Sequence, residues 1–194
     1  MNNRNYVEDD LSLTQKFTIL LFGANCSEPI KGKLWFQKEL FLVAQGIPEL
    51  GEEADFEADF IGPYSELADD QLDRLRIERI VDEEQKELTS SGHKIEQRVK
   101  SAFSEDTLKF VSEIKAFLND LSKDELLGFI YYSYPDMRVE STEFERIAPK
   151  RKEIGVSLFK KGKVSLGKAA IIAGNTQEDL IKILQLRGIP VFAE

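Results

Sequence analysis

Residues 162–191 read GKVSLGKAAIIAGNTQEDLIKILQLRGIPV, and this stretch decides the fold of the C-terminal part of the 194-residue chain. Ser165 is expected to be the N-cap of a short helix, because its hydroxyl accepts a hydrogen bond from a first-turn backbone N–H. Gly174 suits the left-handed residue that ends this helix. Thr176 then caps a second helix, and Asp179, three residues on, completes a variant of the capping box.

The second helix is predicted to bury one face. Leu180, Ile183 and Leu184 recur at helical spacing, and Ile181 adjoins them. Two short capped helices joined by a glycine turn are typical of a helix-turn-helix.

This segment resembles a small prokaryotic family of presumed antitoxins. Members carry the pattern LYxxGxxSLGKAAELAG and end in an RGIPV-like tail. The matching positions here are Leu158, Phe159, Gly162, Ser165 to Ala170, Ala173, Gly174, Gly188, Ile189 and Pro190. The resemblance implies a PIN-type toxin as partner. It also implies an N-terminal β-strand for dimerisation, which this sequence lacks, although a homodimer is kept among the expected assemblies.

Charge is distributed unevenly along the chain. The net charge is −9, yet residues 145–194 carry 10 Lys and Arg against 5 Asp and Glu, whereas residues 1–144 carry 16 against 30. An acidic body repels nucleic acid, and a basic tail tolerates it.

Basic side chains in the tail are the candidate contacts to DNA phosphates, and polar ones on the second helix are the candidate readers of bases. The candidate DNA-binding residues are Lys160, Lys161, Lys163, Lys168, Thr176, Gln177 and Lys182. Glu178 and Asp179 on the same helix oppose tight phosphate contact, so a solvated basic surface is an equal alternative.

The body is predicted to be helical around a small hairpin. Helices are expected at 11–22, 31–45, 65–76, 89–103, 104–121 and 122–132, a loop at 46–51, an extended segment at 54–60, hairpin strands at 80–81 and 86–88, a linker at 137–141 and a helix start at 148. Three helices before a hairpin are the order of a winged helix. The predicted fold is therefore mainly α, with a winged-helix-like domain at 1–140 and a helix-turn-helix domain at 145–194.

The body also resembles the prokaryotic Panacea/SocA-type winged-helix domain, from about residue 11 to 135. The matching positions are Gln37, Lys38, Phe41, Gly62, Pro63, Tyr64, Ser65, Leu67, Leu75, Tyr134 and Pro135. The resemblance implies an antitoxin or an adaptor that delivers toxins to proteases. Gln37, Lys38, Tyr64 and Ser65 are the candidate partner-binding residues, and the turn at 62–65 also reads as a rigid structural corner.

The expected recognition helix of this winged helix is acidic. It carries Glu66, Asp69, Asp70 and Asp73, and the hairpin tip is acidic at 82–84. DNA-reading helices and wings need basic side chains for phosphates. The body is therefore expected to bind protein.

Catalytic and metal-binding chemistry has little support in the sequence. His93 and Cys26 are the only residues of their kinds, which excludes a zinc quartet and leaves no partner for a catalytic dyad. The acidic pair at 69–70 and the acidic run at 82–84 are read as solvated surface rather than as a magnesium site. Phosphate-loop and nucleophile-elbow motifs are absent. The chain is expected to be neither an enzyme nor a binder of a metal or cofactor.

No apolar run suggests a membrane span or a signal peptide, and the single cysteine fits a reducing cytoplasm. The preferred interpretation is an antitoxin-like regulator, whose body binds a toxin protein and whose tail binds DNA or the same partner. The alternatives are a stand-alone transcription regulator and a protease adaptor or interaction scaffold.

Overall fold

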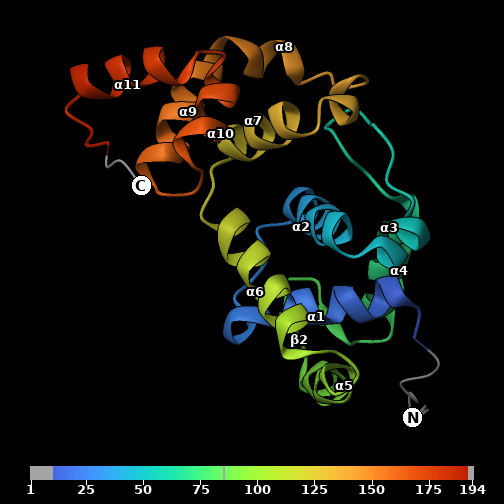
Figure 1. The fold of residues 1–194 in the computed structure, drawn as a ribbon. Helices are drawn as coiled ribbons and strands as arrows, with labels where there is room; N and C mark the ends of the chain where they lie inside the picture. Colours follow the sequence, from blue (N-terminus) through green and yellow to red (C-terminus); the bar gives the residue numbers. More distant parts are fainter. Residues whose placement is uncertain (1–10, 85, 192–194) are drawn as a thin grey trace. The chain divides into compact units, whose positions relative to one another are not determined.

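The computed structural model describes residues 11–84 and 86–191 and is mainly helical, with one small antiparallel hairpin (Figure 1). The chain folds into two compact units. The first contains residues 11–57 and 63–120, and the second contains residues 58–62 and 121–191.

The first unit surrounds one central helix. Its elements are α1 (Leu13–Ser27), α2 (Lys33–Gly46), α3 (Pro48–Ala54), α4 (Glu66–Ile77), β1 (Val81–Asp82), β2 (Glu87–Leu88), α5 (Ser90–Lys100) and α6 (Glu105–Asn119). In Figure 1 the neighbouring helices and the strand β2 lie around α1. Its apolar side chains, among them Phe17, Ile19 and Leu21, are almost completely buried and form the core.

Helix α1 ends where its backbone leaves the helical conformation. Asn25, Cys26 and Ser27 all have positive φ angles. The Nζ atom of buried Lys115 on α6 donates to the backbone carbonyls of Leu21, at 2.8 Å, and of Ala24, at 3.1 Å. These bonds satisfy carbonyls that a helix end leaves without intrahelical partners.

One predicted loop in the body is wrong. Residues 46–51 were expected to be a loop, but α3 begins at Pro48. Proline is tolerated in the first helical turn, and Leu50 and Ala54 lie four residues apart and are buried. Helices α1 to α4 therefore precede the hairpin, where the winged-helix order predicted one helix fewer.

The hairpin is confirmed. Val81 pairs with Leu88 and Asp82 with Glu87, so each strand is two residues long. In the expected extended segment, isolated bridges join Glu57 to Tyr64 and Phe60 to Gly62.

The second unit contains the helix-turn-helix. Its elements are α7 (Lys123–Ser133), η2 (Pro135–Arg138), α8 (Phe144–Ile147), η3 (Ala148–Lys150), α9 (Arg151–Lys160), α10 (Leu166–Ala173) and α11 (Gln177–Leu186). The sequence placed the domain boundary between residues 140 and 145. In the structure the division lies between Asp120 and Leu121, because α7 packs against α9 and α10.

The caps of the helix-turn-helix form as predicted, with one correction. The Ser165 and Thr176 hydroxyls each accept a backbone N–H of the helix that follows. Gly174 is left-handed, with φ 73° and ψ 33°. The capping box at α11 is wrong: the Asp179 carboxylate accepts from the Thr176 hydroxyl at 2.9 Å, where a capping box would bond the N-cap backbone N–H.

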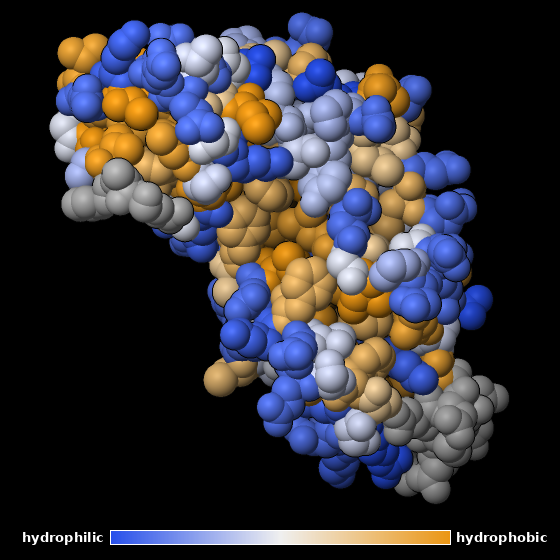
Figure 2. Space-filling model, viewed as in Figure 1, coloured by the Kyte–Doolittle hydropathy of each residue, from blue (hydrophilic) through white to orange (hydrophobic). Residues whose placement is uncertain are grey.

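Figure 2 shows hydrophobic surface on the second unit among charged side chains. Among the side chains of this unit, Ile171 and Leu186 are 60% and 88% exposed. In the part of the chain that the structure describes, none of the helices has the length and hydrophobicity needed to cross a bilayer.

Helices α9 and α10 approach each other at a glycine. A Cβ on Gly155 would lie 2.7 Å from the Ala169 carbonyl oxygen and 2.8 Å from the Ala173 Cβ. The Ala169 carbonyl oxygen and the Ala173 Cβ cannot move independently of the α10 backbone, so a Cβ at position 155 would force α10 to move.

We therefore expect Gly155→Ala to lower the free energy of unfolding by about 1–3 kcal/mol through overpacking. Gly167→Ala is the matched control: its Cβ would meet only the flexible Gln177 side chain, at 3.2 Å. It should be neutral or slightly stabilising, since alanine favours helix. Thermal unfolding of the two variants checks this, and equal melting temperatures would contradict the close approach.

Candidate functional site

The second unit has a groove of about 1210 Å³ on the helix-turn-helix. It lies between the end of α9, the start of α10, the outer side of α11 and the chain that follows α11. We call it the helix-turn-helix groove, and its lining residues are Phe159, Lys160, Gly162 to Gly167, Gln177, Ile181, Gln185 and Arg187 to Val191.

The groove has apolar walls. Phe159, Val164, Leu166 and Ile189 are only partly buried, and they pack onto the small core formed by residues such as Leu180 and Leu184. These side chains thus belong to the core on one side and to the groove on the other. A concave, mainly apolar surface with a few polar groups is the usual composition of a binding site.

The structure divides the predicted basic residues into two sets. Lys160, Lys163 and Gln177 line the groove together. Lys161 instead forms an ion pair with Glu125 of α7, at 2.9 Å, and the ammonium of Lys168 lies 5.8 Å from the ring centroid of Phe129, also on α7. The neighbouring residues Lys160 and Lys161 therefore lie on different surfaces, Lys160 at the groove and Lys161 against α7.

Glu125 anchors the first of these contacts. Its carboxylate accepts hydrogen bonds from the Ser157 hydroxyl at 2.7 Å, the Ser122 backbone N–H at 2.8 Å and the Lys161 ammonium at 2.9 Å. Burial alone would raise the pKa of this carboxyl, but the hydrogen bonds outweigh it and lower the pKa to about 2. Glu125 thus stays ionised and holds Lys161 on α7, while burial lowers the pKa of Lys168.

The predicted base-reading residues on α11 are engaged locally. The Thr176 hydroxyl and the Lys182 ammonium both contact the Asp179 carboxylate, Lys182 at 3.4 Å. Hydrogen bonding to Thr176 and the nearby charge of Lys182 lower the pKa of Asp179. Because Glu178 is exposed beside it, the first turn of α11 presents two carboxylates.

The far end of the groove is fixed by one ion pair. Arg187 donates two hydrogen bonds to the Glu153 carboxylate of α9, at 2.6 and 2.7 Å. This pairing lowers the pKa of Glu153 and raises that of Arg187. A bidentate guanidinium–carboxylate pair fixes direction as well as distance, and this one links the end of α11 to α9.

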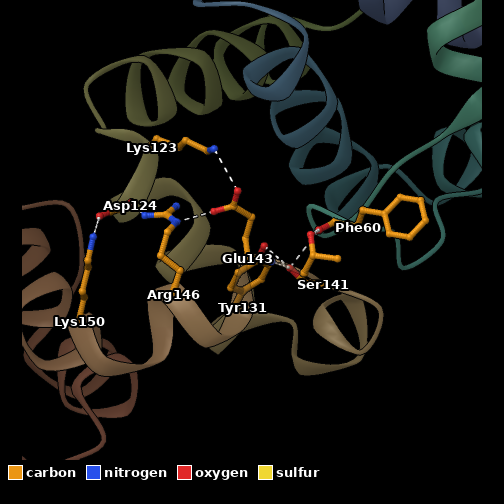
Figure 3. Close-up of polar contacts among 9 residues, drawn as sticks. Phe60, Lys123, Asp124, Tyr131, Ser141, Glu143, Arg146 and Lys150 are labelled. Atoms are coloured by element: carbon orange, nitrogen blue, oxygen red, sulfur yellow. Dashed lines mark hydrogen bonds and ion pairs between the residues drawn. The ribbon is translucent and has the colours of Figure 1, made fainter.

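A second polar network positions the start of the unit (Figure 3). The carbonyl oxygen of Phe60 accepts from the backbone N–H and the hydroxyl of Thr142, at 3.0 and 3.1 Å, and Tyr131 and Ser141 hydroxyls lie 2.6 Å apart. Arg146 lies between the carboxylates of Asp124 and Glu143. This network ties residues 58–62 and the 141–150 segment to α7.

The predicted partner-binding residues of the body come together, but most are buried. Gln37 exchanges two hydrogen bonds with the Ser65 backbone, at 3.0 and 3.1 Å, and Lys38 donates to the Pro63 carbonyl at 2.8 Å. Gln37, Lys38 and Ser65 thus hold the turn from inside. Tyr64 is half-buried, and its hydroxyl donates to Asp69, which pairs with Lys33. Burial and this hydrogen bond raise the pKa of Tyr64.

Sequence reasoning missed one pocket in the first unit. Cys26 and His93 both line a concavity of about 630 Å³, together with Glu96. Glu96 is buried, and it contacts the His93 Nδ1 at 3.2 Å and the Lys100 ammonium at 2.6 Å. In the sequence, His93 and Glu96 are three residues apart and Glu96 and Lys100 are four apart. On a helix this spacing predicts that the three side chains contact one another on one face.

Comparison with known proteins finds a match for one segment. Residues 133–193 match the model of an uncharacterised protein family, UPF0175. The matched segment contains all the residues that line the helix-turn-helix groove. It begins at Ser133, the last residue of α7, so the rest of α7 lies outside the match. No curated protein and no solved structure matches the chain.

The Glu125 contacts lead to a prediction about pH. A carboxyl whose pKa falls from 4.5 to about 2 on folding stabilises the folded state above pH 4.5, and this stabilisation is lost as the pH falls toward 2. Glu125→Gln should lower the unfolding free energy by about 1–3 kcal/mol at pH 7, and the difference should vanish near pH 2.

Denaturant unfolding across this pH range measures the difference. The exposed Glu145 of α8 is the control, and Glu145→Gln should change stability little at any pH. A constant deficit of Glu125→Gln down to pH 2 would show that Glu125 acts by packing alone.

Proposed function

We propose that this chain is an antitoxin-like regulatory protein whose C-terminal unit holds a segment of a partner protein. The observation that carries the proposal is the helix-turn-helix groove, with apolar walls and with Lys160 and Lys163 among its lining. Its volume and composition suit a peptide segment with apolar side chains and acidic flanks.

Electrostatics favour a protein over DNA as the occupant. Binding to duplex DNA draws its affinity from lysines and arginines that neutralise phosphates. Here Lys161 pairs with Glu125, Lys182 pairs with Asp179, and Glu178 adds a further negative charge to the first turn of α11. The second helix of the motif therefore offers little attraction to phosphates.

The sequence comparisons support an antitoxin-like role. The family match covers the groove, and the pattern of residues 158–190 resembles presumed antitoxins. On this proposal the partner is a small toxin encoded next to this chain, and the protein is not an enzyme. An adaptor that delivers the toxin to a protease is a variant of the same proposal, in which the acidic first unit binds a second protein near Tyr64 and Lys33.

Two isoleucines on the second unit allow a matched test. Ile181 lines the groove, whereas Ile171 lies elsewhere on the same unit and is exposed. The product of the neighbouring reading frame is co-expressed with the full chain, and binding is measured by co-purification and calorimetry. Ile181→Arg should weaken binding at least about tenfold, the effect of losing about 1.4 kcal/mol, and Ile171→Arg should leave it unchanged.

A neighbour product that does not bind, or that binds both variants like the parent chain, would contradict the proposal. Circular dichroism of each variant establishes that the helices remain.

DNA binding is the second candidate, favoured by the capped helix-turn-helix and by Gln177 exposed at the start of α11. A mobility shift of the full chain at about 50 and about 200 mM salt tests it. On our proposal the shift is absent or independent of sequence. A sequence-specific shift that Gln177→Ala relaxes and Lys160→Glu/Lys163→Glu abolishes would instead establish a DNA reader.

A further inference from the structure

A second, smaller pocket of the second unit brings two arginines together. It has a volume of about 320 Å³, and its lining residues are Tyr132, Pro135, Arg138, Phe144, Ala148, Arg151 and Ile171. Its residues come from α7, η2, α8, η3, α9 and α10, and none of them lines the helix-turn-helix groove.

Both guanidinium groups are stacked on aromatic rings. The Arg151 Cζ lies 4.2 Å from the Tyr132 ring centroid, and the Arg138 Cζ lies 5.5 Å from that centroid and 4.6 Å from the Phe144 centroid. Contacts of this kind orient a guanidinium and leave its edge available for hydrogen bonding.

Neither arginine is neutralised by a carboxylate within the residues that the structure describes. Arg151 donates to the backbone carbonyls of Ile171 and Ile172, at 2.9 and 3.0 Å, and Arg138 donates to the carbonyl of Tyr131 at 3.3 Å. A guanidinium has five N–H donors, so each retains donors beyond these contacts. By contrast, Arg146 and Arg187 of the same unit both pair with carboxylates.

The fold holds Arg151 in place. A Cβ on Gly174 would lie 2.5 Å from the Arg151 Cζ, so the guanidinium rests against the glycine turn of the helix-turn-helix. Its two carbonyl contacts cap the end of α10. The positive group is therefore positioned before any ligand arrives, which reduces the entropy cost of binding.

We propose that this Arg138–Arg151 pocket binds a phosphate monoester carried on a planar ring, such as a nucleoside monophosphate or an aryl phosphate. A phosphate monoester carries close to two negative charges at neutral pH and matches two guanidinium groups, whereas a carboxylate carries one. Phe144, Pro135 and the 60% exposed Ile171 offer the apolar surface that a ring would cover.

Calorimetry with the full chain tests the pocket, with adenosine 5′-monophosphate and phenyl phosphate as the two probes. Three partial ligands serve as controls. Adenosine lacks the phosphate, inorganic phosphate lacks the ring, and benzoate lacks the second negative charge. At least one probe should bind, about tenfold or more tightly than any partial ligand. The probe that binds identifies the ring, and its affinity should fall as salt is added.

Arg138→Gln should weaken probe binding about tenfold or more, while Arg146→Gln, whose arginine lies between two carboxylates, should not change it. Arg138 makes one backbone hydrogen bond, so the variant is expected to fold, and circular dichroism checks this. Absence of binding by both probes, equal binding of inorganic phosphate, or undiminished binding by folded Arg138→Gln would overturn the proposal. These measurements use no partner protein, so they are independent of the proposed function.

Discussion

The close approach of α9 and α10 is the constraint on which the second unit depends. At Gly155 the backbone of α10 occupies the space that a Cβ would need. On the neighbouring side, a Cβ on Gly128 of α7 would lie 2.8 Å from the Ile154 side chain of α9. Two glycines thus let three helices pack closely, and this packing decides which side of each helix remains open to solvent.

The position of α7 determines the character of the exposed surface. Because Glu125 and Phe129 lie on α7, they draw Lys161 and Lys168 away from the groove and toward α7. What remains at the groove is an apolar surface with Lys160 and Lys163. The segment has a net positive charge in sequence, but its lysines are divided between the groove and α7, which supports the proposal that the groove binds a protein.

Local signals in the sequence were sufficient for the helix-turn-helix. Ser165, Gly174 and Thr176 act through backbone atoms a few residues away, so their roles follow from sequence spacing alone. The boundary between the units did not follow, because the contacts that join α7 to α9 link residues far apart in the sequence, such as Glu125 and Ser157. Long-range pairing also explains why Gln37 and Lys38 are structural: their partners, at 63–65, lie on another element.

The most direct test of the account is amide hydrogen exchange of the full chain, alone and with the product of the neighbouring reading frame. Binding in the groove predicts slower exchange in residues 159–167, at Gln177 and in residues 181–191, which line the groove or lie beside its lining. Protection confined to the first unit, or absent from residues 159–167 and 181–191, would contradict the claim that the helix-turn-helix groove holds the partner.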